Sequence, residues 1–287
     1  MSLIRNFQVA GGTIFGRDHR MVGKNNHDAL AIVQTDDAII GLVCDGCGSG
    51  LHSEVGAKIG AQLIANMLLA NIQRLGPTVK DFCAEIPFPY WERTRQDVLA
   101  QLRVLVQGMG GSFSQTVNDY FLFTTVGFLI LPQYTTVFSI GDGMYILNNG
   151  FNEIGPFPNN APPYLSYGLV DSSLGDEHPE LLKWQIHRQL ANEHVDQILI
   201  GTDGVIDLAN AHDRHLPGKD ALVGPLSQFW TKDIFFSNRD AIRRRLWLAN
   251  RENVALDRER QCLVKSPALL ADDTTLVVAR RTPLEGS

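Results

Sequence analysis

The feature that most constrains the fold is a set of short apolar segments that each stop or start at an aspartate beside a turn. Three of them run into an Asp-Gly pair, at Asp45, Asp142 and Asp203, and a fourth begins after Asp272. A fifth follows Asp28 directly. Apolar, β-branched runs of this length, bounded by Gly, Asn and Asp, are typical of strands. The chain is therefore predicted to build sheets whose strands meet at acidic turns.

The pattern between these aspartates predicts the remaining elements. Strands are expected at 29–33, 39–44, 121–131, 135–140, 145–147, 184–190, 197–201 and 274–279, and helices at 53–74, 93–107 and 240–251. In the first helix, apolar residues recur every four positions and form a core-facing stripe. Strands, helices and strands again, without regular β-α-β alternation, favour an α+β layered fold. Short turns between adjacent strands imply antiparallel sheets.

We expect the whole chain, residues 1–287, to form one domain with three less regular regions. Residues 77–89 are expected to be irregular. Residues 151–179 are rich in Pro, Gly and Asn and are predicted to form a mobile surface loop, which we hypothesise selects substrates. Residues 212–270 are mixed and polar and are predicted to be a helical insertion.

Composition excludes several classes of protein. The formal net charge of −6 disfavours non-specific nucleic-acid binding, which requires neutralised phosphates. No secretory signal and no stretch long enough to cross a bilayer is recognised, so a cytoplasmic protein without membrane contact is expected. Cys44 and Cys47 form a C-x-x-C, but Cys83 and Cys262 stand alone. A disulfide framework, a redox pair or a zinc site is therefore not supported.

The acidic turns also predict a site. One aspartate beside a glycine is more often a turn residue than a ligand, but this chain has five at strand ends. If the strands lie side by side, their ends gather at one rim, where carboxylates repel each other unless a cation lies among them. Mg²⁺ and Mn²⁺ prefer such oxygen ligands. A glycine such as Gly46 lets the backbone carbonyl approach and join the ligands.

These motifs occur in an order that resembles a known family. The order is Asn26-His27-Asp28, Asp45-Gly46-Cys47-Gly48-Ser49, Thr124-Thr125, Gly141-Asp142, Asp203-Gly204 and Asp272-Asp273-Thr274-Thr275. It resembles the type 2C (PPM) metal-dependent protein serine/threonine phosphatases, and looks closest to a divergent bacterial branch. Each motif is weak alone, but the series spans most of the chain.

The resemblance implies a four-layer α-β-β-α sandwich, with two antiparallel sheets packed face to face and helices outside. It implies hydrolysis of phosphoserine and phosphothreonine in protein substrates of a serine/threonine kinase, by a water that bridges two Mg²⁺ or Mn²⁺ ions. The implied metal ligands are Asp45, which bridges both ions, the carbonyl of Gly46, Asp203, Asp272, and Asp28 directly or through a water. A third, weaker ion would be held by Asp142, Asp203 and Asp207. The implied catalytic residues are Asp45, Asp203 and Asp272.

Two departures from the family pattern affect catalysis. Typical members carry a phosphate-binding arginine where this chain has Gly23, so Lys24 or Arg20 is expected to supply the positive charge. Many members also place a histidine, a candidate proton donor, where this chain has Cys47, and a water or His19 could serve instead. The missing arginine keeps open an alternative, a catalytically weak pseudophosphatase that binds phosphoproteins or acts as a scaffold.

Overall fold

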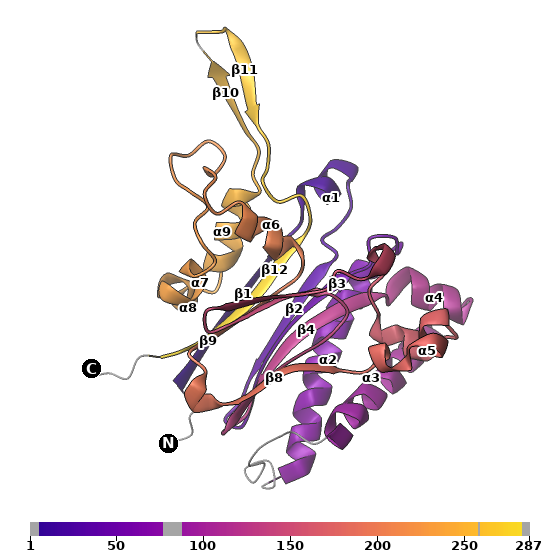
Figure 1. Ribbon diagram of the computed structural model, residues 1–287. Coiled ribbons are helices and arrows are strands. Elements are labelled where there is room, and N and C mark those ends of the chain that lie inside the picture. Colours follow the sequence, from indigo (N-terminus) through magenta and orange to yellow (C-terminus); the bar gives the residue numbers. More distant parts are fainter. Residues whose placement is uncertain (1–5, 77–87, 258, 283–287) are drawn as a thin grey trace.

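A computed structural model describes residues 6–76, 88–257 and 259–282, and within them the chain forms two large sheets (Figure 1). Each sheet has five strands. All neighbouring strands in both sheets are antiparallel, as the sequence predicts. The first, in order β1-β12-β9-β6-β7, contains Phe7–Ile14, Thr274–Arg281, Gln197–Gly201, Gly143–Leu147 and Gly150–Ile154. The second, in order β2-β3-β4-β5-β8, contains Asp28–Gln34, Ile39–Gly46, Phe123–Ile130, Tyr134–Ile140 and Gln185–Ala191.

The two sheets pack face to face around an apolar core. Along β3, Ile39 and Val43 point to this inter-sheet core, whereas Ile40 and Leu42 point to the opposite face. Both faces of the strand are buried, so it reads as a continuous apolar run instead of an alternating one. The sequence therefore predicts the strand clearly, but it does not show which side chains face the other sheet and which face the helices.

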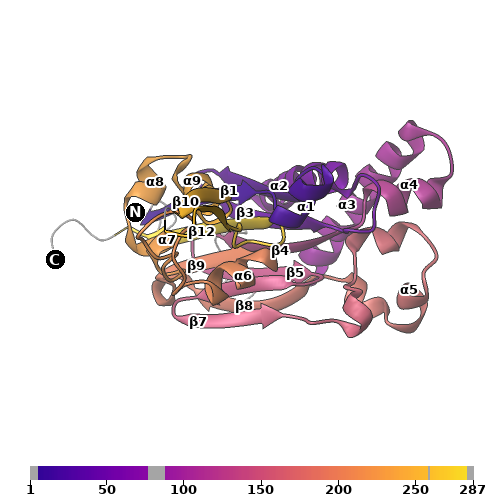
Figure 2. The same cartoon turned by 90° about the horizontal axis from the view of Figure 1, so that it is seen from above.

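Helices cover the outer face of each sheet and give the predicted four layers (Figure 2). Against β2 and β3 lies α2 (Ser53–Leu75), and α3 (Phe88–Met109) and α4 (Phe113–Tyr120) pack against α2 on the same side of this sheet. Against the other sheet lie α6 (Gly204–Asn210), α7 (Gln228–Thr231), α8 (Ile234–Ser237) and α9 (Ala241–Ala249). The α+β sandwich is therefore confirmed.

Helix α2 corrects one expectation, because among the described residues it alone is long and apolar enough to cross a membrane. Half of its apolar window is buried, and Ala61, Ile64 and Leu68 pack into the core over β2 and β3. A core helix passes the same length and hydropathy test, so α2 is weak evidence for a membrane span.

Two irregular regions differ from their prediction. The predicted loop 151–179 starts inside β7, because the turn at Asn148 and Asn149 returns the chain as a hairpin onto β6. It continues through three short helices, η3 (Pro158–Asn160), η4 (Leu165–Leu169) and α5 (Ser173–Glu177), and its mobility stays a prediction. Two further short helices, η5 (Pro179–Leu182) and η6 (Asn192–His194), flank β8. The predicted helical insertion 212–270 also contains a hairpin, β10 (Asn253–Asp257) and β11 (Cys262–Ser266), which projects from the body (Figure 1).

Near the N-terminus, a short helix that the sequence did not suggest, α1 (Arg17–Val22), joins β1 to β2. Its entry residue Gly16 lies against the backbone of Asp272 and Ala271, where a β-carbon would come within 2.4 Å of the Asp272 carbonyl carbon. Glycine is therefore required for this close approach. The expected irregular segment 77–89 and Cys83 lie outside the described residues, except that 88 and 89 begin α3.

Candidate active site

Strand register brings the predicted aspartates to one rim of the sandwich. In the second sheet, Asp28 on β2 pairs with Asp45 on β3, and Asp45 pairs with Thr124 on β4. In the first sheet, β9 pairs with β12, so Asp203 after β9 and Asp272 before β12 lie at the same end. The strands are antiparallel, and the end of one therefore lies beside the start of the next.

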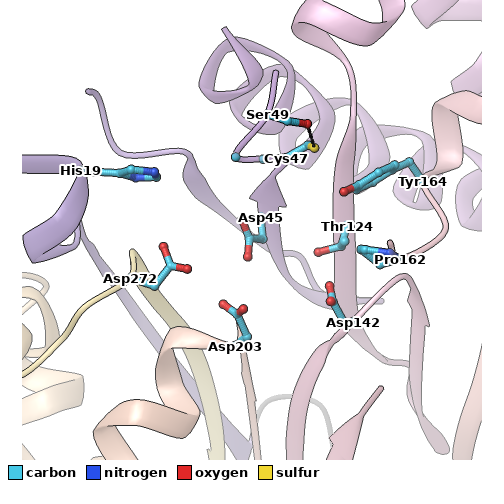
Figure 3. Close-up of a pocket in the computed structure, with 12 residues that line it drawn as sticks. His19, Asp45, Cys47, Ser49, Thr124, Asp142, Pro162, Tyr164, Asp203 and Asp272 are labelled. Carbon is cyan, nitrogen blue, oxygen red and sulfur yellow. Dashed lines mark hydrogen bonds between the residues drawn. The ribbon is translucent and has the colours of Figure 1, made fainter. Parts of the chain in front are cut away.

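These side chains surround a pocket of about 320 Å³ (Figure 3). Its lining residues are His19, Asp45, Gly46, Cys47, Gly48, Ser49, Thr124, Asp142, Pro162, Tyr164, Asp203 and Asp272. Four of the predicted carboxylates point into the same space from four different strand ends (Figure 3). The geometry therefore gathers carboxylates that lie as far as 227 positions apart in the chain, from Asp45 to Asp272.

Burial and mutual repulsion make these carboxyl groups hard to ionise. Burial raises the pKa of Asp45 well above its usual range, and the charges of Asp28 and Asp203 raise it further. Burial, followed by the charges of Asp272 and Asp142, raises the pKa of Asp203 to about 6. Burial also raises the pKa of Asp142. A divalent cation among these groups would lower their pKa values instead, since a nearby opposite charge favours the ionised form.

Asp28 gives the clearest test of whether a cation fits. Its side chain is 1% exposed, and its Oδ2 accepts a hydrogen bond of 2.8 Å from the Thr202 hydroxyl. Its Oδ1 is buried and makes no hydrogen bond to any described residue. Burial, and then the charge of Asp273, raise its pKa. A metal ion or its bound water would satisfy this oxygen, and the all-oxygen donor set fits Mg²⁺ or Mn²⁺.

Asp207 lies on α6, one turn after Asp203, and does not line the pocket. Burial and the nearby charge of Asp272 raise its pKa, while Arg17 lowers it. Its place near Asp203 is compatible with the third ion site, which stays a prediction.

The two predicted phosphate-binding residues lie at different distances from the pocket. The Lys24 ammonium donates a 2.9 Å hydrogen bond to the carbonyl of Gly48, which lines the pocket. The Arg20 guanidinium donates to the carbonyl of Asn250 and lies 3.7 Å from Glu252, neither of which lines it. The phosphate-binding role of each stays a prediction, and Lys24 is the better placed.

His19 is the one histidine among the described residues that lines the pocket, and its ring extends into it (Figure 3). Its Nδ1 lies 2.8 Å from Oδ2 of the buried Asp273. His27, which precedes Asp28, is buried and lies outside the pocket lining, with its Nδ1 3.2 Å from the Ser53 hydroxyl. The sequence did not show that Asp273 orients His19, because this contact joins residues 254 positions apart.

The C-x-x-C pair separates into two environments. Cys44 is buried within β3, and burial raises the pKa of its thiol to about 12. Cys47 lies in the pocket lining, and its Sγ is 3.1 Å from the Ser49 hydroxyl. Burial raises the pKa of the Cys47 thiol, but hydrogen bonds with Ser49 and Tyr164 together outweigh this rise. The pKa is therefore lower than that of an ordinary cysteine. Both cysteines are free.

Comparison with solved structures supports the fold. The structure of a bacterial serine phosphatase aligns with a TM-score of 0.50 at 16% identity, over 96% of this chain and 98% of that chain. A sex-determining protein of C. elegans aligns with a TM-score of 0.52 at 12% identity, over 97% of this chain and 65% of that chain. At these identities the likeness shows the fold alone. A search of curated proteins finds no match.

The family model described as protein phosphatase 2C matches residues 15–234, which is more than half of the chain. The match includes the acidic turns at Asp28, Asp45, Asp142 and Asp203. It agrees with the sandwich and with the carboxylate-lined pocket at its rim. The chain therefore belongs to the protein phosphatase 2C family, whose members are metal-dependent protein phosphatases.

Proposed function

We propose that this chain hydrolyses phosphoserine and phosphothreonine in phosphorylated proteins, using two Mg²⁺ or Mn²⁺ ions. The observation that carries the proposal is the convergence of Asp45, Asp142, Asp203 and Asp272 in one pocket. Carboxylates forced together in this way gain most from a divalent cation. We further propose a cytoplasmic location and a serine/threonine kinase that supplies the substrate.

Each carboxylate has a separate role in this proposal. Asp45, at the centre of the rim, would hold both ions, together with the carbonyl of Gly46. Asp203 and Asp272 would complete one ion's ligands, and Asp28, deeper in the sandwich, would act through its unpaired Oδ1. When bound, the ions supply Lewis-acid chemistry, which lowers the pKa of a water and offsets charge on the phosphoryl oxygens.

The protein's own contribution is position and environment. The β-strands hold the carboxylates rigidly, because strand ends fixed by sheet hydrogen bonds move less than free loops. Burial raises the pKa of Asp142, and a hydrogen bond with Thr124, which pairs with Asp45 across β3 and β4, offsets part of this rise. Lys24, beside Gly48, would attract the substrate phosphate at the mouth of the pocket. A third ion would be held by Asp142, Asp203 and Asp207.

The pseudophosphatase alternative rests on Gly23, which stands where an arginine is typical of the family. The complete carboxylate set speaks against it, because a scaffold without metal would keep several buried like charges together at a cost in stability.

Assay of the purified protein with a small aryl phosphate tests the proposal. We expect turnover with Mn²⁺ or Mg²⁺, and its loss when a chelator is added. Asp45→Asn, Asp203→Asn and Asp272→Asn should each lower kcat by more than about 100-fold, as is typical when a group that stabilises a transition state is removed.

Asp213→Asn is the matched control, because Asp213 is exposed and does not line the pocket. It should leave turnover unchanged, and circular dichroism should show that all four variants fold. Metal-independent turnover would refute the metal-dependent mechanism, and no turnover with any divalent ion would refute the enzyme and favour the scaffold. Near-normal rates in all three pocket variants would show that the site is misplaced.

A further inference from the structure

We propose that His19 is a nitrogen ligand of the ion held by Asp272, and that it shifts the site's preference from Mg²⁺ toward a transition-metal ion such as Mn²⁺. The inference rests on the proposed function, because the ion concerned is one of the proposed pair. It identifies a ligand that none of the acidic motifs contains.

The first step is the way Asp273 is held. Its side chain is 2% exposed, and both carboxylate oxygens already accept hydrogen bonds. Oδ1 accepts from the backbone amide of Gly16 at 2.5 Å, and Oδ2 accepts from that of His27 at 2.6 Å. A carboxylate used in this way has little freedom to turn toward a metal ion. Asp273 is therefore a support for its neighbours and not itself a ligand.

The second step is the tautomer of His19. Because the Asp273 carboxylate only accepts hydrogen bonds, the His19 Nδ1 at 2.8 Å must carry the hydrogen and donate it. The lone pair of the neutral ring is then on Nε2, which makes no hydrogen bond to any described residue. Histidines that bind metals almost always donate their other ring N–H to a carboxylate or carbonyl, which fixes the ring and raises its basicity. The Asp273–His19 pair has this arrangement.

The third step is the position of His19 beside an accepted ligand. One candidate ligand atom each from His19, Asp272 and Asp273 lies within 4.8 Å of the other two, and for His19 this atom is one of the two ring nitrogens. One oxygen of Asp272 accepts from the Asp273 amide at 2.8 Å, which leaves its other oxygen for an ion. Two ligand atoms that share one ion with bonds of about 2.1 Å lie up to roughly 4.2 Å apart. The His19 ring and the Asp272 carboxylate both face the pocket (Figure 3), so a shift of these two side chains within it would let Nε2 and the free Asp272 oxygen share one ion.

A nitrogen ligand changes which metal binds best. Mg²⁺ strongly prefers oxygen ligands and retains its waters, whereas imidazole suits transition metals. With oxygen ligands alone, the pocket would not discriminate Mg²⁺ from Mn²⁺ by ligand type. With His19 added, Mg²⁺ should be disfavoured relative to Mn²⁺. The His27 ring lies 4.3 Å from that of His19, but its two nitrogens face Ser53 and Glu54 and it does not line the pocket.

Electron spin-echo envelope modulation of Mn²⁺ bound to the purified protein tests the proposal without any activity assay. We expect ¹⁴N modulation in the wild type, and its loss in His19→Ala and His19→Gln. The matched control is His194→Ala, an exposed histidine on η6, which should keep the modulation. Competition between the two ions should show that His19→Ala weakens Mn²⁺ binding by about 10- to 100-fold and Mg²⁺ binding much less.

The outcomes separate this proposal from the proposed function. No Mn²⁺ binding by the wild type would remove the proposed metal centre itself. Bound Mn²⁺ without ¹⁴N modulation, or modulation that persists in folded His19 variants, would overturn the His19 ligand while leaving the phosphatase proposal intact. If the variants fail to fold, the wild-type spectrum still shows whether a histidine nitrogen binds Mn²⁺. Among the described residues no histidine other than His19 lines the pocket.

Discussion

Gly23 occupies the position at which family members typically carry a phosphate-binding arginine, and its backbone explains the difference. The residue ends α1 with φ 72° and ψ 21°, in the left-handed region. A residue with a β-carbon there costs roughly 1–2 kcal/mol, which is why glycine is common just after a helix. In this chain the short helix therefore replaces the arginine, and it presents His19 to the pocket instead.

Lys24 then becomes the nearest candidate for the missing positive charge. We predict that Lys24→Ala raises KM for a phosphorylated substrate by roughly two- to fivefold with little change in kcat, the effect expected of an exposed ionic contact. Lys24→Arg, which keeps the positive charge, should have the KM of the wild type. Lys58→Ala, at an exposed position on α2, is the control. An unchanged KM in Lys24→Ala would remove this residue from substrate binding.

At the scale of elements, the segments that the sequence predicts well are those buried on both faces. β3 and β4 are mostly apolar strands buried on both faces, and their predicted bounds lie within two residues of the observed ones. By contrast, α1 has no buried residue and so no apolar period to detect. In β1, Gly11 and Gly12 interrupt the strand pattern, and its partner β12 lies at the other end of the chain.

The same reasoning applies to the site. Each aspartate was recognisable because it follows or precedes an apolar run, and sheet formation alone brings such strand ends together. The hydrogen bond from His19 to Asp273 depends on where α1 docks, which rests on a close backbone approach at Gly16. No local pattern encodes that approach, so the contact between His19 and Asp273 could not be predicted, although the sequence did point to His19 as a candidate proton donor.

The segment after β7 forms a second cavity, of about 640 Å³, which shares Pro162 with the carboxylate-lined pocket. Its walls include Phe157, Tyr167, Leu174 and Leu181. We propose that this cavity binds apolar residues of the substrate protein that lie next to its phosphorylated residue. Substrate selection by residues 151–179 would then take place in this cavity. Apolar side chains on both partners would lose water-exposed area there.

Leu174→Ala tests this location. We predict that it lowers kcat/KM for a phosphopeptide with an apolar flanking residue by about fivefold, since a partly buried leucine contributes on the order of 1 kcal/mol. Turnover of a small aryl phosphate, which does not reach the second cavity, should be unchanged. Phe151→Ala, exposed on β7 outside this cavity, is the control. Equal losses with both substrates would mean that the segment supports the fold and does not select substrates.

At the scale of the whole molecule, the sandwich concentrates electrostatic repulsion between carboxylates at one rim. Two layers of sheet packed through an apolar core fix the strand ends, and the helices outside hold the sheets in place. The acidic groups at the rim cannot move apart without disturbing strand pairing. The fold therefore keeps a destabilising cluster of carboxylates, as functional sites often do.

This arrangement predicts an unusual pH dependence of stability. The pKa of Asp203 rises from its unfolded value to about 6 in the folded chain, so between about pH 4 and 6 the folded state binds more protons than the unfolded state. Stability of the metal-free protein should therefore fall as pH rises through this window. We predict that Asp203→Asn, which removes the titrating group, flattens this fall and raises the metal-free Tm at pH 7.

Thermal melts at pH 4.5 and pH 7, with and without Mn²⁺, measure the effect. At 100 times its Kd, an ion adds about 2.7 kcal/mol of stability, which for a chain of this size raises Tm by about 5–10 °C. The wild type should gain this much at pH 7 and Asp203→Asn much less, because the variant has lost a ligand. Asp213→Asn, exposed and outside the pocket, should behave like the wild type in both conditions. A metal-free Asp203→Asn that melts below the wild type at pH 7 would show that the carboxylates do not repel one another in the folded chain, and the argument for a cation among them would then lose its physical basis.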